Sequence, residues 1–244
     1  MSKDKNIVRV PSIFFNTKTG NLNISGSDIN DVVTVNKVGE NIRVNLKNAN
    51  ANLFKTVKSS LLKSITFSGF GGNDTFANNT NVVSTADGGT GADTIKGGSG
   101  HDMLIGGTGN DVIKGNAGND SCNGGGGNDN IDGGTGNDNL HGDAGDDIVK
   151  GSSGNDDLYG DSGNDDLYGD ADNDSLFGGS DNDDLYGGSG NDDLEGEEGD
   201  DNLDGEDGDD TLNGGEGNDD NLDADDSMDD YDSEEDTRDE NEND

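Results

Sequence analysis

Residues 106–114, GGTGNDVIK, are one unit of a nine-residue pattern that repeats 15 times without insertion from Gly88 to Leu222. Position 1 is Gly in every unit, and position 6 is Asp in every unit. Position 8 is apolar in every unit except the last, where Asn221 stands. Three columns that keep register over this length favour a repeat architecture over a plain acidic spacer.

The columns predict how one unit folds. Glycine permits positive φ and close backbone approach, so we expect positions 1–6 to form a tight turn. Positions 7–9 then form a three-residue strand whose side chains point outward, inward and outward. Two units complete one turn of chain, and stacked turns form a parallel β-solenoid. Its interior holds one apolar residue per nine, which is too little to fold the chain unaided.

The position-6 carboxylates supply what the thin interior lacks. In stacked turns they lie above one another, 18 residues apart, where like charges repel. A dication between stacked turns removes that repulsion and links the turns. Carboxylate and carbonyl oxygens suit Ca²⁺ rather than zinc or copper, and Mg²⁺ gives up its water reluctantly. We therefore expect calcium binding that is coupled to folding.

The candidate ligands form two columns, which leave gaps for about 13 calcium ions at most. Asp74, in the lead-in GFGGNDTF (69–76), is a further candidate. One column consists of Asp93, Asp111, Asp129, Asp147, Asp165, Asp183, Asp201 and Asp219, and the other of Asp102, Asp120, Asp138, Asp156, Asp174, Asp192 and Asp210.

GGTGNDVIK and its neighbours resemble GGxGxDxUx, the repeats-in-toxin (RTX, hemolysin-type) calcium-binding nonapeptide. The resemblance covers residues 88–222. It implies a right-handed parallel β-roll with Ca²⁺ between loops on the same side. In that family, position 6 supplies carboxylates and other loop positions supply carbonyl oxygens.

Composition divides the all-β chain into three segments. Residues 1–87 carry ten Lys/Arg against six Asp/Glu and contain alternating stretches such as NIRVNLKN, which predict a β-rich lead-in or cap. Within it, residues 53–64 predict a short helix or a loop with an apolar stripe. Residues 88–222 form the β-roll. Residues 223–244 are acidic without a periodic apolar position, so we expect a disordered tail.

Four departures from the plain repeat carry expectations of their own. Asp172 and Asp181 replace Gly at position 4, which strains the turn or adds a ligand. Cys122 stands at an inward position and is expected to be a small buried hydrophobe. We expect the last unit to fray at Asn221. Aromatic residues at position 9 predict two stacked pairs on opposite faces, serving as a stabilising ladder or as a patch for polysaccharide or self-association: Tyr159, Tyr168, Phe177 and Tyr186.

Charge and motifs limit the function classes. A net charge of −41 disfavours nucleic acid as a partner, and no apolar run approaches a membrane span. HExxH, GxSxG and phosphate-type GK[ST] motifs are absent, so no enzyme activity is expected. Micromolar cytosolic calcium would leave weak sites empty, which favours an extracellular or cell-surface location. The N-terminus shows no signal-peptide pattern, so the route of export stays open.

The leading hypothesis is therefore a non-catalytic calcium-binding β-roll that folds on Ca²⁺. Two alternatives stay open. One is an adhesin or matrix module that binds polysaccharide or cell surfaces. The other is the repeat part of a secreted enzyme or toxin whose catalytic domain is absent from this chain.

Overall fold

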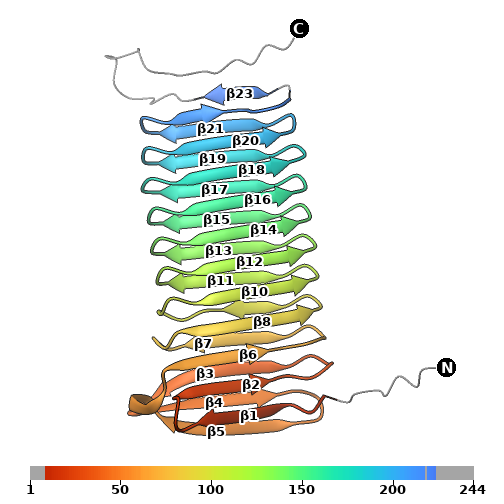
Figure 1. The fold of residues 1–244 in the computed structure, drawn as a ribbon, viewed down its shortest axis with the longest axis vertical. Helices are drawn as coiled ribbons and strands as arrows, with labels where there is room; N and C mark the ends of the chain where they lie inside the picture. Colours follow the sequence, from red (N-terminus) through yellow and green to blue (C-terminus); the bar gives the residue numbers. More distant parts are fainter. Residues whose placement is uncertain (1–8, 218, 224–244) are drawn as a thin grey trace, which may run out of the picture.

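The computed structural model describes residues 9–217 and 219–223 and shows a two-sheet β-solenoid (Figure 1). One sheet has 11 strands, in the order β1 (Ser12–Asn16), β2 (Asn21–Ser25), β6 (Ser64–Ser68), β8 (Ser84–Thr90), β10 (Met103–Thr108), β12 (Ser121–Gly126), β14 (Asn139–Ala144), β16 (Asp157–Ser162), β18 (Ser175–Ser180), β20 (Asp193–Glu198) and β22 (Thr211–Asn213).

The second sheet has 12 strands, in the order β23 (Asp220–Asp223), β21 (Asn202–Asp207), β19 (Asp184–Ser189), β17 (Asp166–Ala171), β15 (Ile148–Ser153), β13 (Asn130–Thr135), β11 (Val112–Ala117), β9 (Thr94–Lys96), β7 (Thr75–Asn79), β3 (Val32–Val38), β4 (Asn41–Lys47) and β5 (Asn52–Lys58). Within the described residues there is no α-helix, only the 3₁₀ turn η1 (Ser59–Leu61), and no helix long and apolar enough to cross a membrane. The predicted all-β parallel solenoid is confirmed.

Strands of the array pair in parallel with the strand 18 residues away, as the spacing predicts. Leu104 lies beside Cys122, and Gly107 beside Gly125. The predicted three-residue strand is wrong, because each strand from β10 to β21 has six residues. Each runs through positions 7–9 of one unit into positions 1–3 of the next. Backbone pairing needs no side chain, so the glycine positions continue the ladder and the turn shrinks to positions 4–6.

The interior is a single column of apolar side chains between the two sheets. Every position-8 residue from Ile95 to Leu212 is buried, with exposed fractions of 0–6%. Cys122 belongs to this column and is buried at 0%, as predicted. Burial raises the pKa of its thiol well above the ordinary value, and nearby carboxylates, Asp120 first among them, raise it further.

The N-terminal end is built from antiparallel strands. β1 pairs antiparallel with β2, and β3, β4 and β5 form an antiparallel meander at the edge of the second sheet. The helix or loop predicted for residues 53–64 is wrong for its first half. Residues 53–58 belong to β5, which pairs with β4 along its whole length, and the 3₁₀ turn η1 follows. Leu53 and Val57 are four residues apart, a spacing that suits a strand as well as a helix.

The two sheets run without a break from the lead-in into the array, since β8 spans residue 88. At the other end, β23 pairs with β21 through an irregular register. The tail predicted to be disordered, 223–244, lies outside the described residues except for Asp223, the last residue of β23.

Candidate metal centre

The structure places all 16 predicted ligands in two continuous columns, one on each side of the solenoid. Each position-6 aspartate from Asp93 to Asp201 donates its backbone N–H to Oδ1 of the position-6 aspartate one turn further on. These bonds are 2.6 Å between Asp93 N and Asp111 Oδ1 and 3.1 Å between Asp201 N and Asp219 Oδ1. Asp74 joins the first column through Asp93, although they are 19 residues apart. One carboxylate oxygen is thus used in holding successive turns together.

The other carboxylate oxygen has no partner in most of the columns. In the described residues, Oδ2 is buried without a hydrogen bond in Asp74, Asp93, Asp111, Asp120, Asp129, Asp138, Asp147, Asp156, Asp165, Asp174, Asp183, Asp192, Asp201 and Asp210. A buried charged oxygen without a donor is costly, because it has lost water and gained nothing in return. A cation is the natural partner for such a row of oxygens.

The position-1 glycines leave the space that these oxygens occupy. A Cβ built on Gly160 would lie 2.6 Å from Asp165 Oδ2 and 2.5 Å from the carbonyl oxygen of Gly178 in the next turn. Any side chain there would displace the carboxylate or the neighbouring turn. Two acceptor oxygens, one carboxylate and one carbonyl, therefore flank the same glycine Cα in this unit.

The glycines of the unit were expected to allow positive φ and close backbone approach, and these two roles fall at different positions. None of the position-1 glycines has a positive φ. Position 2 has one in every unit except at Gly98, even where it is not glycine: Asn116, Asp143, Ser152, Asp161, Asp170, Glu197 and Glu206 have φ of 63–79°. Position 4 is also left-handed at Asp172 (76°) and Asp181 (78°), so these replacements strain the turn. Oδ2 of Asp172 accepts a hydrogen bond from Gly154 N at 3.2 Å.

Electrostatics in the columns oppose a metal-free ionised state. Burial raises the pKa of Asp147, Asp174 and Asp183 from 3.8 to about 8. The hydrogen bond from the preceding turn lowers each of these pKa values, and carboxylates above and below raise them again. Burial also raises the pKa of Asp138 and Asp165 to about 7. Near neutral pH, binding of a proton or another cation to these carboxylates would therefore stabilise the columns.

The oxygen ligands fit calcium, provided that backbone carbonyls and water complete its coordination shell. The oxygens available are carboxylate and backbone carbonyl only, which suits a hard cation that takes six to eight oxygens. Within the described part of the chain, no three Asp, Glu, His or Cys side chains converge on one point. A calcium ion here would therefore draw on one or two position-6 carboxylates and complete its shell with backbone carbonyls and water.

Aromatic residues at position 9 form the two stacked pairs that the sequence predicts. Tyr159 stacks on Phe177 and Tyr168 on Tyr186, each with ring centroids 5.0 Å apart, on different sheets. His141 extends the first row at 4.3 Å from Tyr159. Lys150 lies 4.7 Å from the ring centre of Tyr168. His141 was not predicted, although its position 9 one turn before Tyr159 gives the signal.

Comparison with protein families finds one match, and it falls on this array. The family described as RTX calcium-binding nonapeptide repeats matches in six overlapping segments, 85–113, 97–131, 123–158, 132–167, 159–194 and 186–220. A search of curated proteins finds no match. The matched span, 85–220, contains 15 of the 16 candidate ligands and lacks only Asp74.

Proposed function

Because this chain belongs to the family of RTX calcium-binding nonapeptide repeats, we propose that its solenoid is a non-catalytic, extracellular or cell-surface module that folds as it binds calcium. Calcium binding itself follows from the family. The single observation that supports folding on the metal is the row of buried Oδ2 atoms that have no hydrogen-bond partner.

In each unit, the two carboxylate oxygens at position 6 and the side chain at position 8 have different roles. Oδ1 of the position-6 aspartate accepts the N–H of the preceding turn, and Oδ2 faces the space beside the position-1 glycine. Bound calcium supplies the positive charge that offsets the burial and mutual repulsion of these carboxylates. The position-8 side chain then packs in a turn that is held from both sides.

Location outside the cell rests on affinity. A site built from one or two carboxylates and neutral carbonyls binds calcium weakly, in the range typical of extracellular modules. Millimolar calcium fills such sites and micromolar calcium does not. The absence of hydrolase, protease and phosphate-binding motifs supports a non-catalytic role.

The adhesin alternative has less support from the aromatic rows. A sugar stacks on the open face of a ring, but here the rings lie face to face, with planes 5–9° apart. Stacking covers the ring faces within each row, and Lys150 lies over the Tyr168 end of the second row. The rows therefore fit a ladder that stabilises neighbouring strands better than a platform for polysaccharide.

A matched pair of variants tests the proposal. Asp156 is at position 6 and buried, and Asp157 follows it and is exposed. Asp156→Asn keeps an oxygen for the N–H of Asp138 but removes the charge on the unpartnered oxygen. We expect it to raise the calcium concentration at half-folding, measured by far-ultraviolet circular dichroism, while Asp157→Asn does not.

Calcium titration of the wild-type protein, followed by circular dichroism, is the main test. β-Structure should grow over millimolar calcium, and equal magnesium should not produce this growth. A spectrum that calcium leaves unchanged would contradict the proposal, and so would equal calcium midpoints for the two variants.

A further inference from the structure

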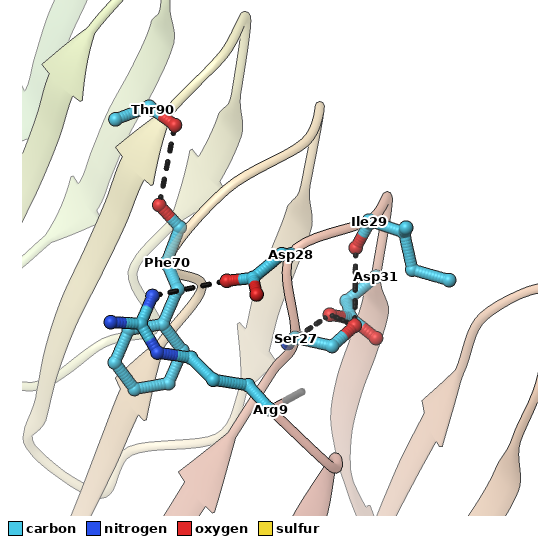
Figure 2. Close-up of polar contacts among 7 residues, drawn as sticks. All are labelled: Arg9, Ser27, Asp28, Ile29, Asp31, Phe70 and Thr90. Carbon is cyan, nitrogen blue, oxygen red and sulfur yellow. Dashed lines mark hydrogen bonds and ion pairs between the residues drawn. The ribbon is translucent and has the colours of Figure 1, made fainter. Parts of the chain in front are cut away.

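The first carboxylate of each column differs from all those that follow. Asp31 begins the column that continues through Asp74, because its backbone N–H donates to Asp74 Oδ1 at 2.7 Å. Its own oxygens are both taken. Oδ2 accepts Ser27 N at 2.7 Å and Ser27 Oγ at 2.9 Å, and Oδ1 accepts Asn48 Nδ2 at 2.7 Å. Figure 2 shows Ser27 and Asp31 facing each other inside one turn.

The second column begins in the same way. Asp102 Oδ1 accepts Ser84 N at 2.5 Å and Ser84 Oγ at 2.8 Å, and Oδ2 accepts Gly98 N at 2.7 Å. Ser84 stands one turn before Asp102, where the array would have another aspartate. A hydroxyl and two amides thus occupy the places that a cation would serve. Neither Asp31 nor Asp102 has the unpartnered oxygen found in the later members.

The turn around Asp31 is held by further contacts within the N-terminal part. Arg9 Nη1 pairs with Asp28 Oδ1 at 3.0 Å, and its guanidinium lies 4.2 Å from the ring centre of Phe70 (Figure 2). Asn48 is fixed by its loop, since its Oδ1 accepts the N–H of Asn50 and of Ala51. The donor for Asp31 is therefore positioned by the β4–β5 connection itself.

The same region has a denser interior than the array. We define the N-terminal cap as residues 9–68, which contain β1–β6 and η1. Eleven buried apolar residues lie between Leu22 and Phe67, whereas 14 are spread from Ile95 to Leu212. The cap therefore buries about one apolar residue in four over that stretch, against one in nine in the array. Its antiparallel pairings are also local in sequence, which favours independent folding.

We propose that the N-terminal cap folds without calcium and is the permanent template on which the calcium-dependent array assembles. The protein's own donors at Asp31 and Asp102 take the place of the metal, so calcium sites begin with Asp74 in one column and Asp120 in the other. This inference rests on the proposed calcium-coupled folding of the array. It adds a direction to that folding, from the cap toward the C-terminal turns.

Hydrogen–deuterium exchange of the full chain, followed by mass spectrometry of peptides, tests the inference. In excess EGTA, we expect peptides from residues 12–68 to exchange about tenfold or more slower than unfolded chain. Peptides from residue 121 onward should exchange as unfolded chain. In millimolar calcium both groups should be protected.

The possible results separate the inference from the proposed function. If the cap exchanges freely in EGTA while calcium protects the whole chain, the metal-free cap is overturned and calcium-coupled folding stands. If the array is protected in EGTA as well, both fail, because nothing then depends on the metal.

The variant Asn48→Asp tests directly whether the hydrogen bond from Asn48 to Asp31 takes the place of a metal ion. It keeps the oxygen that accepts the loop amides but places a second carboxylate beside Asp31. We expect the cap to lose its protection in EGTA and regain it in calcium. Asn45→Asp makes the same charge change in β4, where the Asn45 side chain donates to Thr34 Oγ1 at 3.4 Å and does not reach Asp31, and should leave the cap protected. A cap that stays protected in EGTA with Asn48→Asp would overturn the role given to Asn48.

Discussion

Adding one methyl group at Gly124 should disturb the array more than the same group two residues further on in β12. A Cβ on Gly124 would lie 2.7 Å from the carbonyl oxygen of Gly142 and 3.0 Å from Asp129 Cγ, and nearer still to Asp129 Oδ2. Neither neighbour can move freely. Gly142 is backbone of the next turn, and Asp129 is held by the N–H of Asp111 at 2.7 Å. Gly126 is the control, because a Cβ there meets nothing within 4 Å and its φ is not positive.

The magnitude follows from these contacts. Overfilling a packed site costs about 1–3 kcal/mol. Alanine at an unstrained glycine position stabilises by about 0.4–1 kcal/mol, because it restricts the unfolded chain. That gain applies to both alanine variants, since neither glycine has a positive φ, and it cancels between them. Gly124→Ala should therefore be less stable than Gly126→Ala by about 1–3 kcal/mol. Displacing Asp129 Oδ2 should also raise the calcium concentration needed for folding.

Urea unfolding of the calcium-loaded proteins, followed by circular dichroism, measures the difference between the two alanine variants. A calcium titration of each variant gives the second readout. Equal urea midpoints, or a more stable Gly124→Ala, would refute the claim that position 1 is glycine to make room for the carboxylate.

Three further predictions concern the metal-free state, the buried thiol and the interior. Because the pKa values of Asp147, Asp174 and Asp183 rise from 3.8 to about 8, their protonation favours the metal-free fold. That stability is fully present below about pH 4 and is lost as the pH rises through about 8. In protein freed of calcium by dialysis, circular dichroism should thus show more β-structure at pH 5 than at pH 8, and the opposite order would contradict this. Cys122, buried at 0%, should react slowly with a maleimide in calcium and rapidly in EGTA, and equal rates would place it outside a calcium-dependent core. Leu167→Ala should cost about 2–5 kcal/mol in urea unfolding with calcium, whereas Asp166→Ala at the preceding, partly exposed position should cost far less.

Much of the array could be predicted from the sequence, because each position of the nine-residue unit has one structural role. The inward residues from Ile95 to Leu212, the spacing of 18 and the stacked aromatics all follow from periodicity. Strand length could not be predicted, since positions 1–3 pair through backbone and carry no apolar signal. The antiparallel meander was only partly visible. Leu53 and Val57 fit helix and strand equally, and pairing of β5 with β4 decides between them.

The special start of the columns was also hidden from periodicity. Asp102 lies on the nine-residue register, so counting alone treats it as an ordinary member, and Ser84 lies before the array. Asp31 and Asn48 lie outside the array and are brought together only by the fold around β4 and β5. What distinguishes these positions is which donors reach a carboxylate, and that depends on contacts between turns.

Position 1 shows why residue identity and residue role must be separated. Glycine there was expected to allow positive φ or close backbone approach. Its φ is ordinary, so only the close approach applies, while the left-handed positions 2 and 4 accept Asn116, Asp172 and Glu197. Left-handed backbone costs only about 1–2 kcal/mol per residue, which a stacked solenoid can absorb. A side chain at position 1 would instead meet the position-6 carboxylate and the carbonyl of the next turn at once. Position 1 is therefore always glycine because it leaves room for the ligand oxygens, whereas positions 2 and 4 vary because their strain is local.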